Sequence, residues 1–224
     1  MKKKLLLFDV DGTLVRLDGA GLRALDKTFY DVFDVKDIVY KVDFYGKTDP
    51  AIYEDIMNIA GLPVNLLTEK KNEIRAAYIE HLKYEISVFP VNPVIPGIID
   101  FLEAANNNPD FIIGLLTGNI EPGAYIKIGR WGLADYFGFG AFGSDSKIRA
   151  ELVDIAVSRA KAKYAINSFD KNDIYIIGDT PLDIKCAKDK GVVAVVVAIG
   201  KYSVNELKQY KPDICIKNIS DLRF

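Results

Sequence analysis

Cysteine and histidine are scarce in this chain of 224 residues, which has two cysteines and one histidine. Cys186 and Cys215 have neither the spacing of a zinc site nor the pairing expected of a disulfide framework. We therefore expect a protein of a reducing cytoplasm, in which both thiols are buried as small apolar groups. The single histidine, His81, falls within a helical pattern and is interpreted as an ordinary helix residue.

The chain also lacks an excess of either charge and any long apolar run. Its formal net charge is −2, and the basic residues are scattered without interleaved aromatic residues, which argues against nucleic acid or an anionic membrane as a partner. Three lysines precede the first apolar run, but Asp9 ends that run too soon for a signal peptide. No segment approaches the length of a membrane span, so a cytoplasmic location is the expectation.

What the sequence does have is an abrupt change from apolar to acidic residues near its start. The run Leu5–Phe8 passes directly into Asp9 and Asp11, followed by Gly12 and Thr13. A short apolar run without alternation is typical of a strand buried on both faces, as in parallel α/β sheets. Ligand sites in such sheets lie just beyond the carboxyl ends of the strands. The two acids therefore stand where such folds carry out their chemistry.

Two further apolar segments end in the same way. The strand predicted at 111–117 ends in the hydroxyl of Thr117, and the strand predicted at 174–178 is followed by Asp179 and Asp183. Thr180 is a plausible cap of a helix that begins at the next residue, which places Asp183 in its first turn. Because parallel strands end at one edge of a sheet, these side chains are expected to converge on a single pocket.

These motifs, in this order, resemble those of the haloacid dehalogenase-like (HAD) hydrolase superfamily. Asp9-x-Asp11-Gly12-Thr13 resembles its motif I, Thr117-Gly118-Asn119 its motif II, and the segment from Asp179 to Asp183 its motif IV. The resemblance implies an α/β fold with a Rossmann-like core, whose parallel sheet is covered by helices on both faces. It also implies an inserted helical cap of the C1 type.

The distribution of predicted elements agrees with an insertion of this kind. Roughly a hundred residues separate the first two strands, far more than one crossover needs, and most of them carry helical patterns. We predict a core domain over 1–15 and 92–224 and a helical cap over 16–91. The predicted strands are 3–9, 111–117, 174–178, 192–197 and 213–216, and the helical patterns of the cap are 19–34, 49–60 and 66–87.

The resemblance implies a role for each acid. Asp9 is the expected nucleophile and also a ligand of Mg²⁺, which offsets repulsion between a carboxylate and a phosphate dianion. The backbone carbonyl of Asp11 is a further implied ligand, and its side chain is the expected proton donor to the leaving alcohol. Asp179 is expected to hold the metal directly, with Asp183 as another ligand or as a partner of the ligands.

A phosphate group also needs hydrogen-bond donors and a cation. The Thr117 hydroxyl and the Gly118 N–H are expected to bind its oxygens, and Asn119 either binds phosphate or shapes the turn. The lysine usual in the third motif of the family is missing. Alignment of the following helix by its apolar positions places Arg149 there, with Lys147 as the competing cation.

The acidic side chain of Asp11 also distinguishes between the reaction classes of the superfamily. Dehalogenases have none at this position and transport ATPases have threonine, so the resemblance implies a Mg²⁺-dependent phosphatase that forms an aspartyl-phosphate. The expected partner is a small phosphorylated metabolite, in the manner of phosphoglycolate phosphatases, and the protein is a monomer or homodimer. Lys47 in the cap is a candidate substrate contact. The alternatives are a phosphomutase of the β-phosphoglucomutase kind and a catalytically silent binding protein.

Overall fold

A single parallel sheet forms the centre of the molecule. The computed structural model describes residues 3–223, and within them six strands are ordered β3-β2-β1-β4-β5-β6, all parallel to their neighbours. The first strand of the chain thus lies in the middle of the sheet, between β2 and β4. The strands are β1 (Lys4–Phe8), β2 (Phe111–Thr117), β3 (Gly140–Phe142), β4 (Ile174–Gly178), β5 (Val193–Val197) and β6 (Ile214–Ile216).

The five strands predicted from the sequence are all present, and the predicted α/β fold is confirmed. The bounds of β2 and β4 agree with the prediction to the residue, because each is an unbroken apolar run buried on both sides. The sequence analysis missed β3, which spans only three residues and pairs with the last part of β2. A strand this short has too few residues to show a pattern of its own.

Helices cover both faces of the sheet, and successive residues of β1 point to opposite layers. Leu5 and Leu7 belong to the apolar core under α7, α8 and α9, whereas Leu6 and Phe8 belong to the core under α5 and α6. This alternation is the period of two expected of a strand. The covering helices are α5 (Ile98–Asn106), α6 (Glu121–Gly129), α7 (Arg149–Tyr164), α8 (Pro181–Lys190) and α9 (Val204–Gln209).

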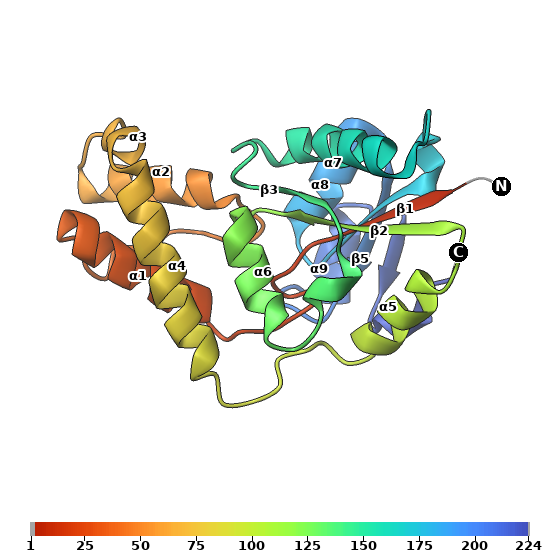
Figure 1. The fold of residues 1–224 in the computed structure, drawn as a ribbon, viewed down its shortest axis with the longest axis horizontal. Helices are drawn as coiled ribbons and strands as arrows, with labels where there is room; N and C mark the ends of the chain where they lie inside the picture. Colours follow the sequence, from red (N-terminus) through yellow and green to blue (C-terminus); the bar gives the residue numbers. More distant parts are fainter. Residues whose placement is uncertain (1–2, 224) are drawn as a thin grey trace.

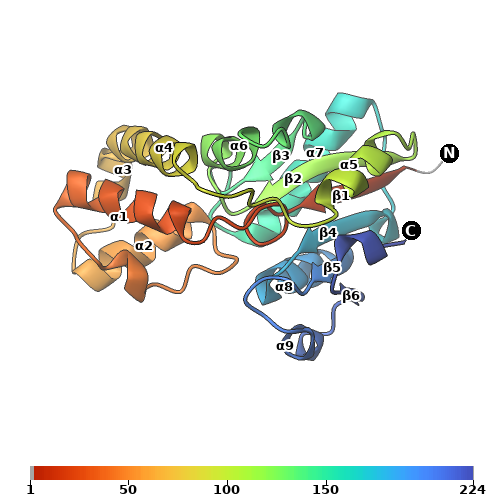
Figure 2. The ribbon, with the colours of Figure 1, turned by 90° about the horizontal axis from the view of Figure 1, so that it is seen from below.

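The remaining helices lie together beyond the carboxyl edge of the sheet, on the side away from both chain ends (Figures 1 and 2). All of them come from the interval between β1 and β2, as expected of an inserted cap, and α1 packs along α4. The pattern at 66–87, predicted as one helix, is broken at Lys70 into two. The cap helices are α1 (Ala20–Phe33), α2 (Asp49–Ala60), α3 (Leu66–Glu69) and α4 (Lys71–Ser87).

No helix within residues 3–223 combines the length and the apolar character that crossing a membrane requires. The segments that join cap and core run past the end of β1. Val15 pairs with Val94 of the returning chain, and the N–H of Arg16 donates to the carbonyl of Pro93. These two links hold the outgoing and returning segments side by side, which fixes where the cap stands over the sheet. The predicted domain bounds, 16–91 for the cap, stay a prediction.

Candidate active site

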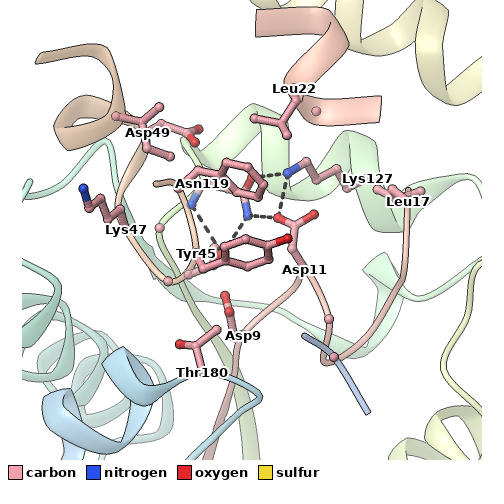
Figure 3. A pocket seen from close by; sticks show the side chains of 18 of the residues that line it. Asp9, Asp11, Leu17, Leu22, Tyr45, Lys47, Asp49, Asn119, Lys127 and Thr180 are labelled. Carbon is pink, nitrogen blue, oxygen red and sulfur yellow. Dashed lines mark hydrogen bonds and ion pairs between the residues drawn. The ribbon is translucent and has the colours of Figure 1, made fainter. Parts of the chain in front are cut away.

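A cavity of about 600 Å³ lies between the carboxyl edge of the sheet and the cap. The ends of β1, β2 and β4 contribute Asp9, Thr117 and Asp179 to its wall, as the sequence predicted, and α1 and α2 contribute apolar residues such as Leu22 and Ile52. Figure 3 shows the polar side chains of the sheet edge meeting those of the cap in this space. The cavity therefore belongs to both parts of the molecule.

Asp9 follows β1 directly, and its side chain is 7% exposed. Its N–H donates to the carbonyl of Ile177 in β4, which extends the sheet pairing by one residue and holds the carboxyl group at the edge. Burial raises the pKa of Asp9 to about 6, and the neighbouring Asp183 adds to this rise while Arg149 opposes it. A carboxylate that has lost its water in this way is a stronger nucleophile than a solvated one.

Arg149 is the first residue of α7 and is as buried as Asp9. Its Nη2 lies 3.3 Å from Asp9 Oδ2 and 2.5 Å from Asp183 Oδ1. Nη1 donates to the carbonyl of Gly46 in the cap at 3.2 Å. Its Nε is buried and donates to no protein atom in the part of the chain described. One guanidinium thus contacts two acids and the cap, and it keeps one unused donor.

Asp179, after β4, is packed between two glycines. A Cβ on Gly12, whose φ is +81°, would stand 2.3 Å from Asp179 Oδ2, and one on Gly200 would stand 2.0 Å from the same atom. Both positions therefore admit only glycine at this distance. Asp179 Oδ1 is buried and has no hydrogen-bond partner among the described residues. Burial, and the nearby acids with it, raises the pKa of Asp179 well above its usual value.

Asp183 takes part in a capping box at the start of α8. Its Oδ2 accepts from the N–H and the hydroxyl of Thr180, while Oδ1 faces Arg149. Oxygen atoms of Asp9, Asp179 and Asp183 all lie within 4.8 Å of one another. Three buried carboxylates so close together are unfavourable unless cations offset their charge, and carboxylate oxygens are the ligands that Mg²⁺ prefers. This cluster is the candidate metal site.

Asp11 lines the same cavity two residues after Asp9, and its side chain is about half exposed. Its Oδ2 accepts from Lys127 Nζ at 2.6 Å and from Asn119 Nδ2 at 2.8 Å. Lys127 also donates to Asn119 Oδ1, and Asn119 Nδ2 also donates to Thr117 Oγ1 at 2.8 Å. The predicted residues Asp11, Thr117 and Asn119 thus come together in one hydrogen-bonded network with a lysine that was not predicted. Figure 3 labels Asp11, Asn119 and Lys127 of this network.

The cap touches the sheet edge through the loop that precedes α2. The N–H of Asp49 donates to the carbonyl of Gly118 at 2.7 Å, and Asp49 Oδ2 accepts from the N–H of Ile120 at 2.8 Å. A Cβ on Gly118 would stand 2.1 Å from the carbonyl oxygen of Lys47, so a glycine is required for this contact. Burial raises the pKa of Asp49 to about 6. The cap is therefore docked directly onto the predicted phosphate-binding turn.

Of the two cations proposed for the third motif, only Arg149 lies in the cavity. Lys147 is 57% exposed and pairs with Glu54 of the cap at 3.1 Å. Its backbone carbonyl accepts from the Thr48 hydroxyl, so it contributes to docking the cap through its main chain. Lys47 lines the cavity, but its amine pairs with Asp55 at 2.8 Å.

Sequence reasoning missed Lys127 and Asp49. Lys127 lies in a helix between two isoleucines, where a lysine is ordinarily a solvated residue, and nothing in the local pattern marks it as buried. Asp49, which is followed by a proline, looks like an ordinary acid in the first turn of a helix. The only signal available was its position in the same cap segment as Lys47.

With this geometry established, comparison with known proteins identifies the family. The model of the haloacid dehalogenase-like hydrolases matches residues 6–197, which include every acid of the site. The chain belongs to that family. This membership confirms the superfamily expected from the sequence motifs and shows that the chain is a hydrolase of that family.

The individual relatives have low sequence identity to this chain. The probable phosphatase IndB of Dickeya dadantii is 25% identical over 226 residues, covering 98% of this chain and 92% of the relative. A β-phosphoglucomutase of Clostridium difficile has a TM-score of 0.75 at 18% identity, covering 100% of this chain and 94% of its own. A predicted phosphoglycolate phosphatase of Haemophilus somnus has a TM-score of 0.67 at 18% identity, with 99% and 96% covered. The two structures show that the fold is shared.

Proposed function

We propose that the protein is a Mg²⁺-dependent phosphomonoester hydrolase that acts on a small phosphorylated metabolite through an aspartyl-phosphate. One observation carries the proposal. Asp9, a buried carboxylate at the end of the central strand, has the Arg149 guanidinium within 3.3 Å and two further acids beside it, and the acid Asp11 lines the same cavity. A nucleophile, a charge-neutralising group and a proton donor are therefore present around one cavity.

The residues present fit a divalent cation. Asp179 Oδ1 is buried and has no partner within residues 3–223, an arrangement that costs free energy unless a cation binds this oxygen or a water donates to it. Asp9 and Asp179 would hold Mg²⁺ through their carboxylates, together with the backbone carbonyl of Asp11, and Asp183 would support them or bind as well. When bound, the ion neutralises charge on the phosphate and on Asp9.

The reaction then follows in two steps. In the first, an oxygen of Asp9 attacks phosphorus, the bond from phosphorus to the alcohol oxygen breaks, and Asp11 gives that oxygen its proton. In the second, the Asp11 carboxylate takes a proton from water, whose oxygen attacks phosphorus. The bond between phosphorus and the Asp9 oxygen breaks, which releases inorganic phosphate and regenerates the free Asp9 carboxylate. Asp11 ends protonated, ready for the next substrate.

The same cavity is also lined by hydrogen-bond donors that can bind the phosphate oxygens. The Thr117 hydroxyl accepts from Asn119 and, among residues 3–223, donates to no protein group, so its hydrogen is available to the ligand. The unused Nε of Arg149 is a second donor, and the N–H of Gly118 is a third. Arg149 rather than Lys147 is our choice for the cation of the third motif, because only Arg149 reaches Asp9.

The cap sets the class of substrate. Leu22, Leu25 and Ile52 present apolar surface above the sheet edge, in a cavity of about 600 Å³, which is large enough for a small organic phosphate. A docked cap also excludes water while the phosphate is transferred, and it has to move for product to leave. These features favour a phosphorylated metabolite over a phosphoprotein, in the manner of phosphoglycolate phosphatases.

The test is hydrolysis of p-nitrophenyl phosphate with Mg²⁺ and with EDTA, for the native protein and for Asp9→Asn. We expect Mg²⁺-dependent release that falls at least about 10⁴-fold in the variant, since an amide is not a nucleophile. Asp154→Asn, a change in an exposed acid far from the cavity, is the matched control. Residual activity close to native would remove Asp9 from its role. Release from no phosphate ester would favour the phosphomutase alternative instead.

A further inference from the structure

Lys127 is a buried cation that the two steps above leave unused. It lies on α6, its side chain is 7% exposed, and its ammonium contacts Asp11 Oδ2 and Asn119 Oδ1, both at 2.6 Å. Removing an ammonium from water is costly unless it is paired and hydrogen-bonded, and here Asp11 pairs with it. The same contacts that keep Lys127 buried therefore act on the proposed proton donor.

Lys127 also fixes the orientation of the Asn119 amide. A lysine can only donate hydrogen bonds, so the amide oxygen must face it, and the NH₂ group must face the opposite way. That NH₂ group donates to Asp11 Oδ2 and to Thr117 Oγ1, both at 2.8 Å. The amide of Asn119 thus has all its groups occupied, and it carries the effect of Lys127 to two residues of the cavity.

As a result, the two oxygens of the Asp11 carboxyl group have different surroundings. Oδ2 receives both donors, whereas Oδ1 receives none within residues 3–223 and lies on a side chain that is 47% exposed. A carboxyl group this open would otherwise turn freely about its Cα–Cβ bond. Anchoring one oxygen leaves the other available to the leaving group.

We propose that Lys127 is a positioning residue for proton transfer, holding Asp11 so that Oδ1 faces the oxygen of the leaving alcohol. The proposal rests on the proposed phosphatase function. Lys127 does not touch phosphate in this assignment, since Arg149 is the cation that contacts Asp9. A purely structural role is the alternative, because Gly21 of the cap packs close to the ammonium, where a Cβ would stand 3.2 Å from Nζ.

The two roles differ in how they depend on the leaving group. p-Nitrophenolate leaves readily without a proton, whereas the alkoxide of benzyl alcohol leaves only when protonated, and the two phosphates are similar in size. The test compares kcat/KM for p-nitrophenyl phosphate and benzyl phosphate in the native protein and in Lys127→Met. kcat/KM covers the steps up to the aspartyl-phosphate, which are those that need the proton donor. The methionine keeps the apolar stem but removes the ammonium.

We expect Lys127→Met to lower kcat/KM for benzyl phosphate about 100-fold and for p-nitrophenyl phosphate less than about 5-fold. Equal losses with both substrates, or none with benzyl phosphate, would overturn the proposal. Lys190→Met removes another lysine that is paired with an acid, Asp154, far from the cavity, and should leave both values unchanged. If Lys127→Met does not fold, Asn119→Ala breaks the same network. It should weaken hydrolysis of benzyl phosphate at least about 10-fold more than that of p-nitrophenyl phosphate.

A crystal structure of Lys127→Met supplies a measurement that does not depend on turnover. We expect the Asp11 carboxyl group to leave its native rotamer or to occupy more than one, and an unchanged Asp11 would count against the proposal. If the native protein hydrolyses neither phosphate, the proposed function fails, while this measurement still decides whether Lys127 positions Asp11.

Discussion

The two halves of the cavity are built in different ways. The buried half sits on the core alone, where strand ends and helix starts bring three carboxylates around one guanidinium. The cap-side half is assembled across the boundary, from a loop after β1, a turn and helix after β2, and the start of a cap helix. The buried half consists of Asp9, Arg149, Asp179 and Asp183, and the cap-side half of Asp11, Asn119, Lys127 and Asp49.

This difference separates phosphate binding from proton transfer. Among the described residues, the hydrogen bonds and ion pairs of the buried half lie within the core, apart from the one between Arg149 and Gly46, so we expect this half to keep its geometry when the cap is not docked. Asp49, by contrast, meets the turn at Gly118 and Ile120 only while the cap is docked. We infer that phosphate binding is a property of the core, whereas the surroundings of the proton donor are completed when the cap closes.

The prediction with the largest expected effect tests whether the buried half binds phosphate while the cap-side half transfers the proton. Asp11→Asn keeps an oxygen that accepts from Lys127, but an amide can neither give nor take the proton. We expect kcat for benzyl phosphate to fall about 10³-fold, while inhibition by inorganic phosphate stays within about twofold of native. Steady-state kinetics with phosphate as competitor measures both. If phosphate binding were lost together with turnover, the halves would not be separable.

The next prediction concerns the two cations considered for the buried half. Arg149→Ala removes the partner of Asp9 and Asp183, so we expect phosphate inhibition to weaken about 100-fold and the free energy of unfolding to fall by about 3 kcal/mol. Lys147→Ala removes only an exposed pair with Glu54 and should change stability by less than about 1 kcal/mol. Urea unfolding and phosphate inhibition measure the two effects. The reverse order would show that Lys147 is the cation of the third motif.

The smallest effect is expected from the cap-side half and concerns stability against pH. The pKa of Asp49 is raised from 3.8 to about 6 in the folded protein, so its protonated form is favoured by folding. Its contribution to stability is therefore fully present below pH 3.8 and is lost as the pH rises through about 6. Above that, a charged carboxylate stays buried beside the cap boundary at a cost on the order of 2 kcal/mol.

Asp49→Asn removes that cost and retains an oxygen for the N–H of Ile120. We expect a higher melting temperature than native at pH 7.5 and little difference at pH 4, as measured by thermal unfolding at both values. Asp55→Asn, on the same helix but with a side chain that is 39% exposed, is the control and should follow the native pH dependence. If the melting temperatures of Asp49→Asn and the native protein differed by the same amount at both pH values, Asp49 would not be buried as a charge at neutral pH.

The parts of the fold that sequence reasoning located are those with strong local signals. The apolar runs at 111–117 and 174–178 gave β2 and β4 to the residue, and the pattern at 49–60 gave α2. Where the local signal is weak, prediction was wrong or silent. The break at Lys70 was missed because the helical pattern continues across it, and β3 was missed because three residues show no period.

The same division holds within the site. The acids and Thr117 of the motifs follow apolar strands or open a helix, and the parallel sheet brings their positions to one edge. The sequence by itself therefore placed Asp9, Asp11, Thr117 and Asp179 at the cavity and Asp183 beside them. Only the tertiary structure decided that Arg149 and not Lys147 reaches Asp9, that Lys127 is buried and that Asp49 contacts the turn. Long cationic side chains reach several positions from one backbone site, and their location depends on which carboxylates and carbonyls packing places within reach. That depends on how distant segments of the chain pack together, and no local pattern encodes it.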